Sequence, residues 1–293
     1  MIKGIDISIW NGEINWEKVK RSGIDFVMIR SSYGDGSREF INNGYDQNFE
    51  KNYINARSVG LDIGVYHYSY AKSISEALRE ASFFLDTIRG KRFEYPVVLD
   101  IEDEDAQAGL RGEELTDIAD SFLKYIESYG YYVAIYSSRY WLENYLNMSR
   151  LTEYDIWLAE WTQRPKYSGN YGIWQYSSTG SVDGIIGNVD LNIAYKNYPE
   201  IMKVNGLNGF GIEIKEEKSI VVYSNESDRM AAEILADNEN IPIYFNKGKS
   251  LSDYSRIIHI GKKPDDINAN HIIFGRNRLE TVEKVLKFIK RRK

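Results

Sequence analysis

The sequence has 293 residues, of which 43% are hydrophobic, 14% are aromatic and none is cysteine, and its net charge is −6. These values exclude disulfides, thiolate zinc sites and cysteine nucleophiles, do not fit a mainly disordered chain, and argue against nucleic acid as the main partner. The length favours one large domain followed by a smaller one.

Short apolar runs alternate with amphipathic helical patterns through the first 200 residues. Strands are predicted at 2–8, 26–30, 64–68, 97–100, 132–136, 154–159, 171–176 and in a last piece ending at Asp190, with helices at 16–23, 48–58, 73–88, 115–128 and 139–146. Repeated β-then-α units with nearly all-apolar strands predict a parallel sheet covered by helices. Because helices are missing between the last strands, we expect an irregular β/α barrel.

Acidic residues fall where the predicted strands end. Asp100 and Glu102 close the apolar run 95–102 at i, i+2 spacing, which places both side chains on one face of a strand. Asp6 lies on the first strand, and Asp190 is expected to end the last one. In a β/α barrel the carboxyl ends of the strands share one face, so these four carboxylates should converge on one cleft.

Aromatic residues accompany the acids. Tyr33, Tyr66, Tyr136 and Trp161 lie at or just after the ends of predicted strands, and Trp10 follows the first strand. Aromatic faces stack on the apolar faces of sugar rings, and paired carboxylates carry out glycosidic chemistry. The pattern therefore favours a carbohydrate site, although core packing is an equal alternative for Tyr66, Tyr136 and Trp161 taken singly.

An ordered series of motifs resembles the family 25 glycoside hydrolases, the Chalaropsis-type lysozymes found in many bacteriophage endolysins. The series comprises GIDISIWNGEINW (4–16), GIDFVMIRSSYG (23–34), GVYHY (64–68), LDIE (99–102), IYS (135–137), IWLAEW (156–161), WQY (174–176) and NVD (188–190). It covers about residues 1–200. A lone D-x-E is weak evidence, whereas the series in this order is strong.

The resemblance implies a muramidase that cuts the β-1,4 bond between N-acetylmuramic acid and N-acetylglucosamine in peptidoglycan. It assigns Glu102 as the general acid, Asp100 as its neighbouring aspartate, and Asp6 and Asp190 as the other two acids of the site. Either Asp100 orients the substrate's acetamido group as the nucleophile, or another aspartate activates water.

Two other functions remain open at this stage. One is a chitinase-like hydrolase of N-acetylglucosamine polymers, and the other is a non-catalytic wall-binding protein that keeps the barrel as a scaffold. The three histidines are scattered and there is no H-E-x-x-H spacing, so zinc chemistry is disfavoured and no metal or cofactor is expected. Trp16, Trp141 and Trp157 are expected to pack in the core.

A change in composition divides the chain near residue 205. Every Trp lies before it, and the excess of acidic residues gives way to an excess of basic ones. We expect a catalytic barrel at 1–204, a Gly/Asn-rich linker at 205–211 and a small α/β domain at 212–293. The predicted strands of that domain are 219–223, 241–245, 256–261 and 271–275, the predicted helices are 226–240 and 279–290, and a basic tail covers 290–293.

The small domain is similar to the wall-binding domains of clostridial phage endolysins. This similarity implies binding to the cell wall through 212–293, and the excess of basic residues suits an anionic wall polymer. Because Met202 falls at the linker, internal translation from it could produce a free binding domain and allow oligomerisation through that domain. No signal-peptide pattern or membrane-length run is evident. We therefore expect synthesis in the host cytoplasm, no membrane insertion, and action on the wall after holin-type release.

Overall fold

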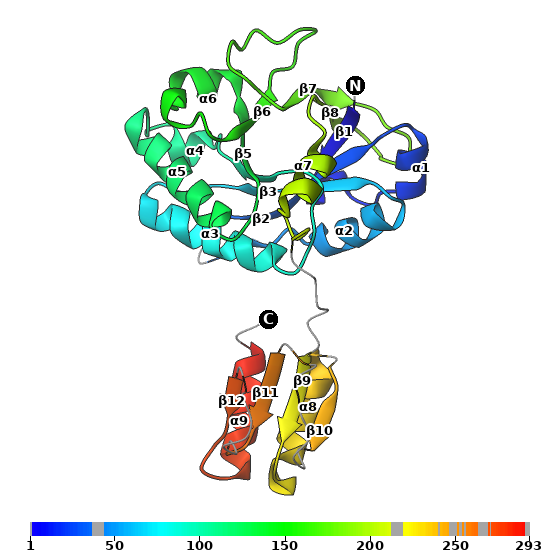
Figure 1. Ribbon diagram of the computed structural model, residues 1–293, viewed down its shortest axis with the longest axis vertical. Coiled ribbons are helices and arrows are strands. Elements are labelled where there is room, and N and C mark those ends of the chain that lie inside the picture. The colour runs from blue at the N-terminus through cyan, green and yellow to red at the C-terminus, as the bar shows by residue number, and fades with distance from the viewer. Residues whose placement is uncertain are drawn as a thin grey trace. The chain divides into compact units, whose positions relative to one another are not determined.

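The computed structural model describes residues 2–36, 44–211, 219–239, 241–245, 251, 254, 256–262, 269 and 271–290. Its contacts divide the chain into two compact units, Met1–Glu213 and Ile214–Lys293. Figure 1 shows the first unit as strands ringed by helices and the second as a small sheet with helices.

Eight strands close a barrel in chain order. They are β1 Ile2–Ile7, β2 Phe26–Tyr33, β3 Asp62–Tyr68, β4 Val97–Asp100, β5 Val133–Ser138, β6 Asp155–Ala159, β7 Ile173–Gly180 and β8 Val189–Ala194. Consecutive strands from β1 to β7 pair in parallel. The last strand, β8, pairs antiparallel with both β7 and β1. The expected irregular β/α barrel is therefore confirmed, with the irregularity in its last strands.

Helices cover the outside of the barrel, as the repeated β-then-α pattern predicts (Figure 1). They are α1 Trp16–Arg21, α2 Phe49–Ser58, α3 Ile74–Ile88, α4 Glu104–Gln107, α5 Glu113–Glu127, α6 Arg139–Asn144 and α7 Tyr198–Asn205, with 3-10 turns η1 Ile9–Asn11 and η3 Met148–Arg150. The Ser73 side chain caps α3 by accepting a hydrogen bond from the Glu76 amide. None of the described helices is long and apolar enough to cross a bilayer.

Two apolar layers hold the barrel together. On β2, Val27 and Ile29 point outward into the cluster shared with the helices, whereas Phe26 and Met28 point into the barrel. Gly4 and Gly64 lie beside these two inward side chains, and a Cβ at either glycine would clash with them. At the level of these residues the barrel is therefore filled by side chains.

The segment 205–211, expected to be a linker, belongs to the first unit instead. Asn208 is fully buried; its side chain accepts a hydrogen bond from the Tyr132 amide at 2.7 Å and donates one to the Tyr95 carbonyl at 2.8 Å. These bonds satisfy backbone groups at the lower end of the barrel. The unit boundary consequently lies a few residues later, between Glu213 and Ile214.

The second unit is a four-stranded parallel sheet in the order β10-β9-β11-β12. Its elements are β9 Ser219–Tyr223, η4 Glu226–Asp228, α8 Arg229–Glu239, β10 Ile243–Phe245, β11 Arg256–Ile260, β12 His271–Ile273 and α9 Arg278–Lys290. Ala232, Leu235 and Val285 pack from the helices onto the sheet. The predicted small α/β arrangement is confirmed, and the last three residues of the predicted basic tail lie outside the described residues.

Candidate active site

The candidate acids lie on the inward rows of the barrel strands, at the carboxyl end of the parallel sheet. On β4 the buried Val98 belongs to the inner cluster, and Asp100 follows two residues later on the same row. Glu102 continues this spacing just beyond the strand and is only partly buried. The two carboxyl groups repel each other, since the charge of Glu102 raises the pKa of Asp100.

Asp190 lies on the same face, but its position within its strand differs from the expected one. It is the second residue of β8, not the last residue of a strand. Because β8 is antiparallel, its beginning lies beside the carboxyl end of β1, and Asp190 is the direct cross-strand partner of Asp6. The convergence predicted from the sequence therefore holds, but the position of Asp190 within its strand was wrong.

Two side-chain amides hold Asp6 in place. Gln175 Nε2 donates to Asp6 Oδ2 at 2.9 Å, and Asn192 Nδ2 donates to the same oxygen at 2.7 Å. Tyr136 Oη in turn donates to Gln175 Oε1, and Trp157 Nε1 donates to Asn192 Oδ1. Each amide is thus oriented by an aromatic donor, and Asp6 has one fixed position.

Burial and mutual repulsion favour the protonated forms of these acids. Burial and the charge of Asp190 raise the pKa of Asp6 to about 8, although its two amide partners oppose the rise. Burial, followed by the charges of Asp190 and Asp103, raises the pKa of Glu102 to about 7. Burial raises the pKa of Asp190, and burial with the charge of Glu102 raises that of Asp100 well above its usual range. Near neutral pH the cluster therefore retains protons that an acid catalyst could donate.

The turn that carries Glu102 is fixed by hydrogen bonds on both sides. The Ile101 amide donates to the Tyr136 carbonyl at 3.1 Å, and Ser137 Oγ donates to the Ile101 carbonyl at 2.6 Å. Asp103 then caps α4 by accepting from the Ala106 amide, and it accepts a second bond from Tyr68 Oη at 3.1 Å. Glu102 is thus presented on a constrained backbone next to Asp100.

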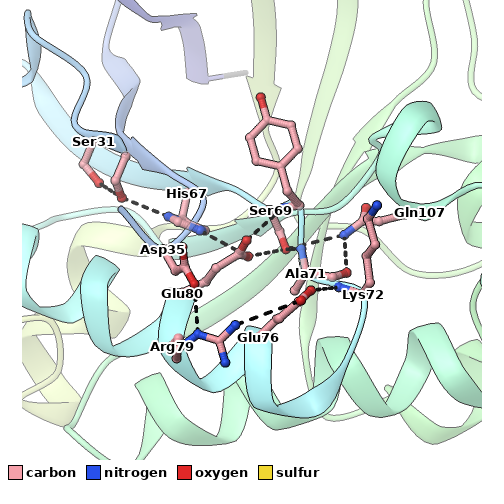
Figure 2. A network of polar contacts seen from close by, with 12 residues as sticks. Ser31, Asp35, His67, Ser69, Ala71, Lys72, Glu76, Arg79, Glu80 and Gln107 are labelled. Atoms are coloured by element: carbon pink, nitrogen blue, oxygen red, sulfur yellow. Dashed lines mark hydrogen bonds and ion pairs between the residues drawn. The ribbon is translucent and has the colours of Figure 1, made fainter. Parts of the chain in front are cut away.

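Figure 2 shows a network of polar contacts around His67, Ser69 and Glu80 that reaches Gln107 on α4, the helix that follows this turn. Gln107 Nε2 donates to the Ala71 carbonyl at 3.1 Å, and Ser69 Oγ donates to Glu80 Oε2 at 2.6 Å. His67 Nε2 lies 3.5 Å from the same Glu80 oxygen. His67 is fully buried and stacks against Phe122 on α5, so it supports the barrel wall and does not face the acids.

The five candidate sugar-binding aromatics differ in exposure. Tyr66 and Tyr136 are nearly buried, at 9% and 8% exposed, and both rings contact Trp157 edge-on inside the barrel. Trp161 is 60% exposed, and its Nε1 donates to Gln175 Oε1 at 3.0 Å. This bond joins an exposed indole to the residue that holds Asp6.

The other two aromatics lie on the loops after β1 and at the end of β2. Trp10 is 85% exposed on η1, and Tyr33 lies 5.4 Å from the Arg30 guanidinium. Both therefore lie at the carboxyl ends of parallel strands, the end of the barrel that carries the acids. Trp16, Trp141 and Trp157 are buried, as expected for core residues.

Neither Gln175 nor Asn192 was predicted as a site residue from the sequence, although the sequence contains a signal for each. Gln175 lies between the aromatic residues Trp174 and Tyr176, and its inward position follows from Ile173 two residues earlier. Asn192 follows Asp190 at the same i, i+2 spacing that singled out Asp100 and Glu102. Amides on an inward row beside carboxylates are the donors that a buried acid requires.

A barrel whose carboxyl face gathers partly protonated acids among aromatic rings defines the class of β/α-barrel glycoside hydrolases. Residues 5–185 match the family model described as "Glycosyl hydrolases family 25". The chain belongs to this family and is a glycoside hydrolase.

Characterised proteins of this class resemble the chain over its barrel or over its whole length. The autolytic lysozyme of Clostridium acetobutylicum is 30% identical over 192 residues, which are 65% of this chain and 55% of that relative, so the chain matches little more than half of it. The solved structure of the CTP1L endolysin is 28% identical with a TM-score of 0.59, over 99% of this chain and all of the other. The autolysin LytC of Streptococcus pneumoniae, solved with a synthetic peptidoglycan ligand, is 27% identical with a TM-score of 0.58, over 66% of this chain and 46% of that one.

Proposed function

We propose that the chain is a muramidase that hydrolyses the β-1,4 bond between N-acetylmuramic acid and N-acetylglucosamine in bacterial peptidoglycan. The observation that carries this proposal is the pair Asp100 and Glu102 on one inward row, facing Asp6 and Asp190 across the barrel mouth. Family membership, a lysozyme relative and a relative solved with a peptidoglycan ligand support it.

Glu102 is the general acid that protonates the leaving oxygen. Its pKa of about 7 and its partial exposure suit a group that is protonated near neutral pH and still reaches a substrate. Asp100 lies deeper, and its Oδ1 accepts no hydrogen bond from the described residues. In a mechanism assisted by the substrate, Asp100 would accept the acetamido N–H of a bound sugar.

Asp6 and Asp190 complete the acid cluster, and the aromatics are the sugar contacts. Trp161 and Trp10 offer exposed faces for stacking, Tyr33 lies at the rim, and Tyr66 and Tyr136 line the floor. Asp6 is held by two amides and its pKa is raised to about 8, so near neutral pH it is a fixed, largely protonated group beside the reaction centre and not a mobile base.

A substrate comparison tests the choice of polymer. Purified peptidoglycan and chitin are offered to the full chain at equal mass, and soluble reducing ends are measured. Release from peptidoglycan alone supports the muramidase. Release from chitin alone would instead establish the chitinase-like alternative.

The second unit is proposed to bind the wall, with an anionic polymer as its ligand. The similarity to an endolysin over nearly the whole length of this chain supports a role in wall lysis for both units, after holin-type release from the host cytoplasm. A tethered binding unit raises the local concentration of a catalytic unit on an insoluble polymer. Residues 214–293 fused to a fluorescent protein should decorate host walls, and failure to sediment with any purified wall would remove this part of the proposal.

Oligomerisation through the second unit is a further part of the proposal. The CTP1L structure is described as regulated by a secondary translation product. In this chain a product starting at Met202, within α7, would contain the whole second unit. Mass spectrometry of the expressed protein tests for that product, and the conservative variant Met202→Leu should abolish it.

A further inference from the structure

A cavity of about 620 Å³ lies between the loop that follows β1 and the loop that joins β7 to β8. Residues 13–15 and Lys18 line it from the first loop and the start of α1, and residues 183–186 line it from the second loop. Strands β1 and β7 belong to the parallel series, so both loops lie at the end of the barrel that carries the acids. The cavity is thus formed by two loops of the catalytic end.

The two loops are held close together at a glycine. The Asn15 amide donates to the Gly184 carbonyl at 2.8 Å. Gly184 has a φ of +103°, and a Cβ at this position would lie 2.4 Å from the Asn15 carbonyl oxygen. Lys18 Nζ donates to Asp183 Oδ1 at 3.2 Å and joins the same two loops. These contacts fix the separation of the loops, and with it the width of the cavity.

The lining combines apolar and charged side chains. Ile185 is buried and Ile14 packs against the core, whereas Ile186 is 90% exposed. The Lys18 and Asp183 side chains are 47% and 68% exposed. Their bond uses one donor of the ammonium group and one oxygen of the carboxylate, so each group keeps the capacity to bind a ligand group of opposite charge. Apolar side chains beside exposed charges of both signs suit a ligand that also carries both signs.

The same lining does not suit a sugar ring. Its residues, all of which the structure describes, are three isoleucines, a glycine, an asparagine and three charged residues, with no aromatic ring among them. The acid cluster, by contrast, has Tyr136 and Trp161 bonded to Gln175 beside Asp6. Because sugar rings stack on aromatic faces, the cavity fits a peptide better than a saccharide.

The cavity lies within reach of a substituent on the reacting sugar. Ile186 precedes Asp190 by four residues, and four residues of extended chain span at most about 14 Å. Muramic acid carries a short peptide in peptidoglycan, and in the proposed reaction the muramic acid whose bond is cut lies beside the acids. Its peptide begins there, and an extended peptide of similar length covers the distance to the cavity.

We propose that this cavity binds the peptide that muramic acid carries. Lys18 contacts a carboxylate of the peptide, Asp183 contacts its free ammonium group, and Ile14 and Ile186 contact its alanine side chains. The inference rests on the proposed muramidase activity and extends it, because the enzyme then prefers peptide-bearing strands to bare glycan.

Methyl NMR measures the binding without any activity. An N-acetylmuramoyl peptide, which has no glycosidic bond to cut, is titrated into the full chain labelled at the δ1-methyl groups of isoleucine. The resonances of Ile14 and Ile186, assigned by their loss in Ile14→Val and Ile186→Val, should shift, whereas N-acetylmuramic acid alone should leave them in place. Unchanged resonances at millimolar peptide would overturn the proposal.

Kinetics on two substrates test the preference. Soluble glycan strands are compared with the same strands from which an amidase has removed the peptides. The unmodified chain should have a KM about tenfold lower for the peptide-bearing strands, and in Lys18→Met/Ile186→Ser this ratio should fall toward one. The matched variant Lys124→Met/Ile54→Ser removes an exposed lysine from α5 and an exposed isoleucine from α2, and it should keep the ratio.

The ratio of the two KM values separates recognition of the peptide from a general loss of structure, which would affect both substrates alike. Equal KM values for the two substrates in the unmodified chain would contradict the proposal. If neither substrate releases muramic acid reducing ends, the proposed function fails, while the NMR titration still decides whether the cavity binds the peptide.

Discussion

Asp6 on β1 and Asp190 on β8 are direct cross-strand partners at the mouth of the barrel. Opposite residues of an antiparallel pair have Cβ atoms about 4.5–5.5 Å apart, so two ionised carboxylates there repel each other. The charge of Asp190 accordingly raises the pKa of Asp6. The closing strand of the barrel therefore pairs two carboxyl groups at its active face, and Asp6 keeps its proton near neutral pH.

This relationship predicts a stability that falls as pH rises. Asp6 has a pKa of 3.8 when unfolded and about 8 when folded, so between these values the folded state holds a proton that the unfolded state has lost. The raised pKa values of Asp100, Glu102 and Asp190 act in the same direction. In urea unfolding, Asp6→Asn should be more stable than the unmodified chain at pH 8, and the difference should shrink toward pH 4.

The control for this measurement is Asp183→Asn, because Asp183 is exposed at the surface. Its difference from the unmodified chain should not follow the same pH dependence. Equal pH slopes for Asp6→Asn and the unmodified chain would show that Asp6 is ionised normally in the folded state.

Replacing Glu102 by glutamine removes the proposed proton donor and keeps the shape of the side chain. The rate of peptidoglycan solubilisation should fall by about 10²–10⁴, the usual contribution of general acid catalysis. Binding to intact walls should persist in co-sedimentation. Glu104→Gln, on the exposed start of α4, is the matched control and should retain activity; comparable losses in both variants would show that the acid has been misassigned.

The pKa of Glu102 predicts the alkaline side of the activity profile. An acid with a pKa of about 7 loses its proton as pH rises through that value, so kcat/KM should decline above neutrality. Initial rates on a soluble peptidoglycan fragment from pH 4 to pH 9 test this. A rate that stayed constant from pH 6 to pH 9 would exclude Glu102 as the acid.

Gln175 connects Asp6 to two aromatic side chains and should be required for full activity. In Gln175→Met, Asp6 loses one donor, so its pKa should rise further, and Tyr136 Oη and Trp161 Nε1 lose their acceptor. Leaving the buried Tyr136 hydroxyl without an acceptor costs about 1–3 kcal/mol, whereas the indole of Trp161 is exposed to water. We expect kcat to fall by about tenfold and the thermal midpoint to drop, whereas the exposed Gln47→Met should change neither.

Much of this arrangement could be predicted from local sequence. The i, i+2 spacing after an apolar strand placed Asp100 and Glu102 on one row, and the alternation of strands and helices predicted the barrel that brings them to Asp6. These features depend on strand periodicity and on helix amphipathicity, which a single sequence carries.

The remainder depended on contacts between distant segments. Strand direction decided the position of Asp190, and no local pattern states that β8 is antiparallel. The Gly/Asn-rich composition of 205–211 predicted a linker, but hydrogen bonds to Tyr95 and Tyr132 attach Asn208 to the barrel.

The identity of the cut bond tests the central claim most directly. Purified peptidoglycan is digested by the full chain, the soluble fragments are reduced with borohydride, and their ends are identified by mass spectrometry. The proposed muramidase produces new reducing ends of N-acetylmuramic acid, and Glu102→Gln should produce almost none. New ends consisting of N-acetylglucosamine would contradict the assignment, because they would place the cleavage on the other glycosidic bond of the polymer.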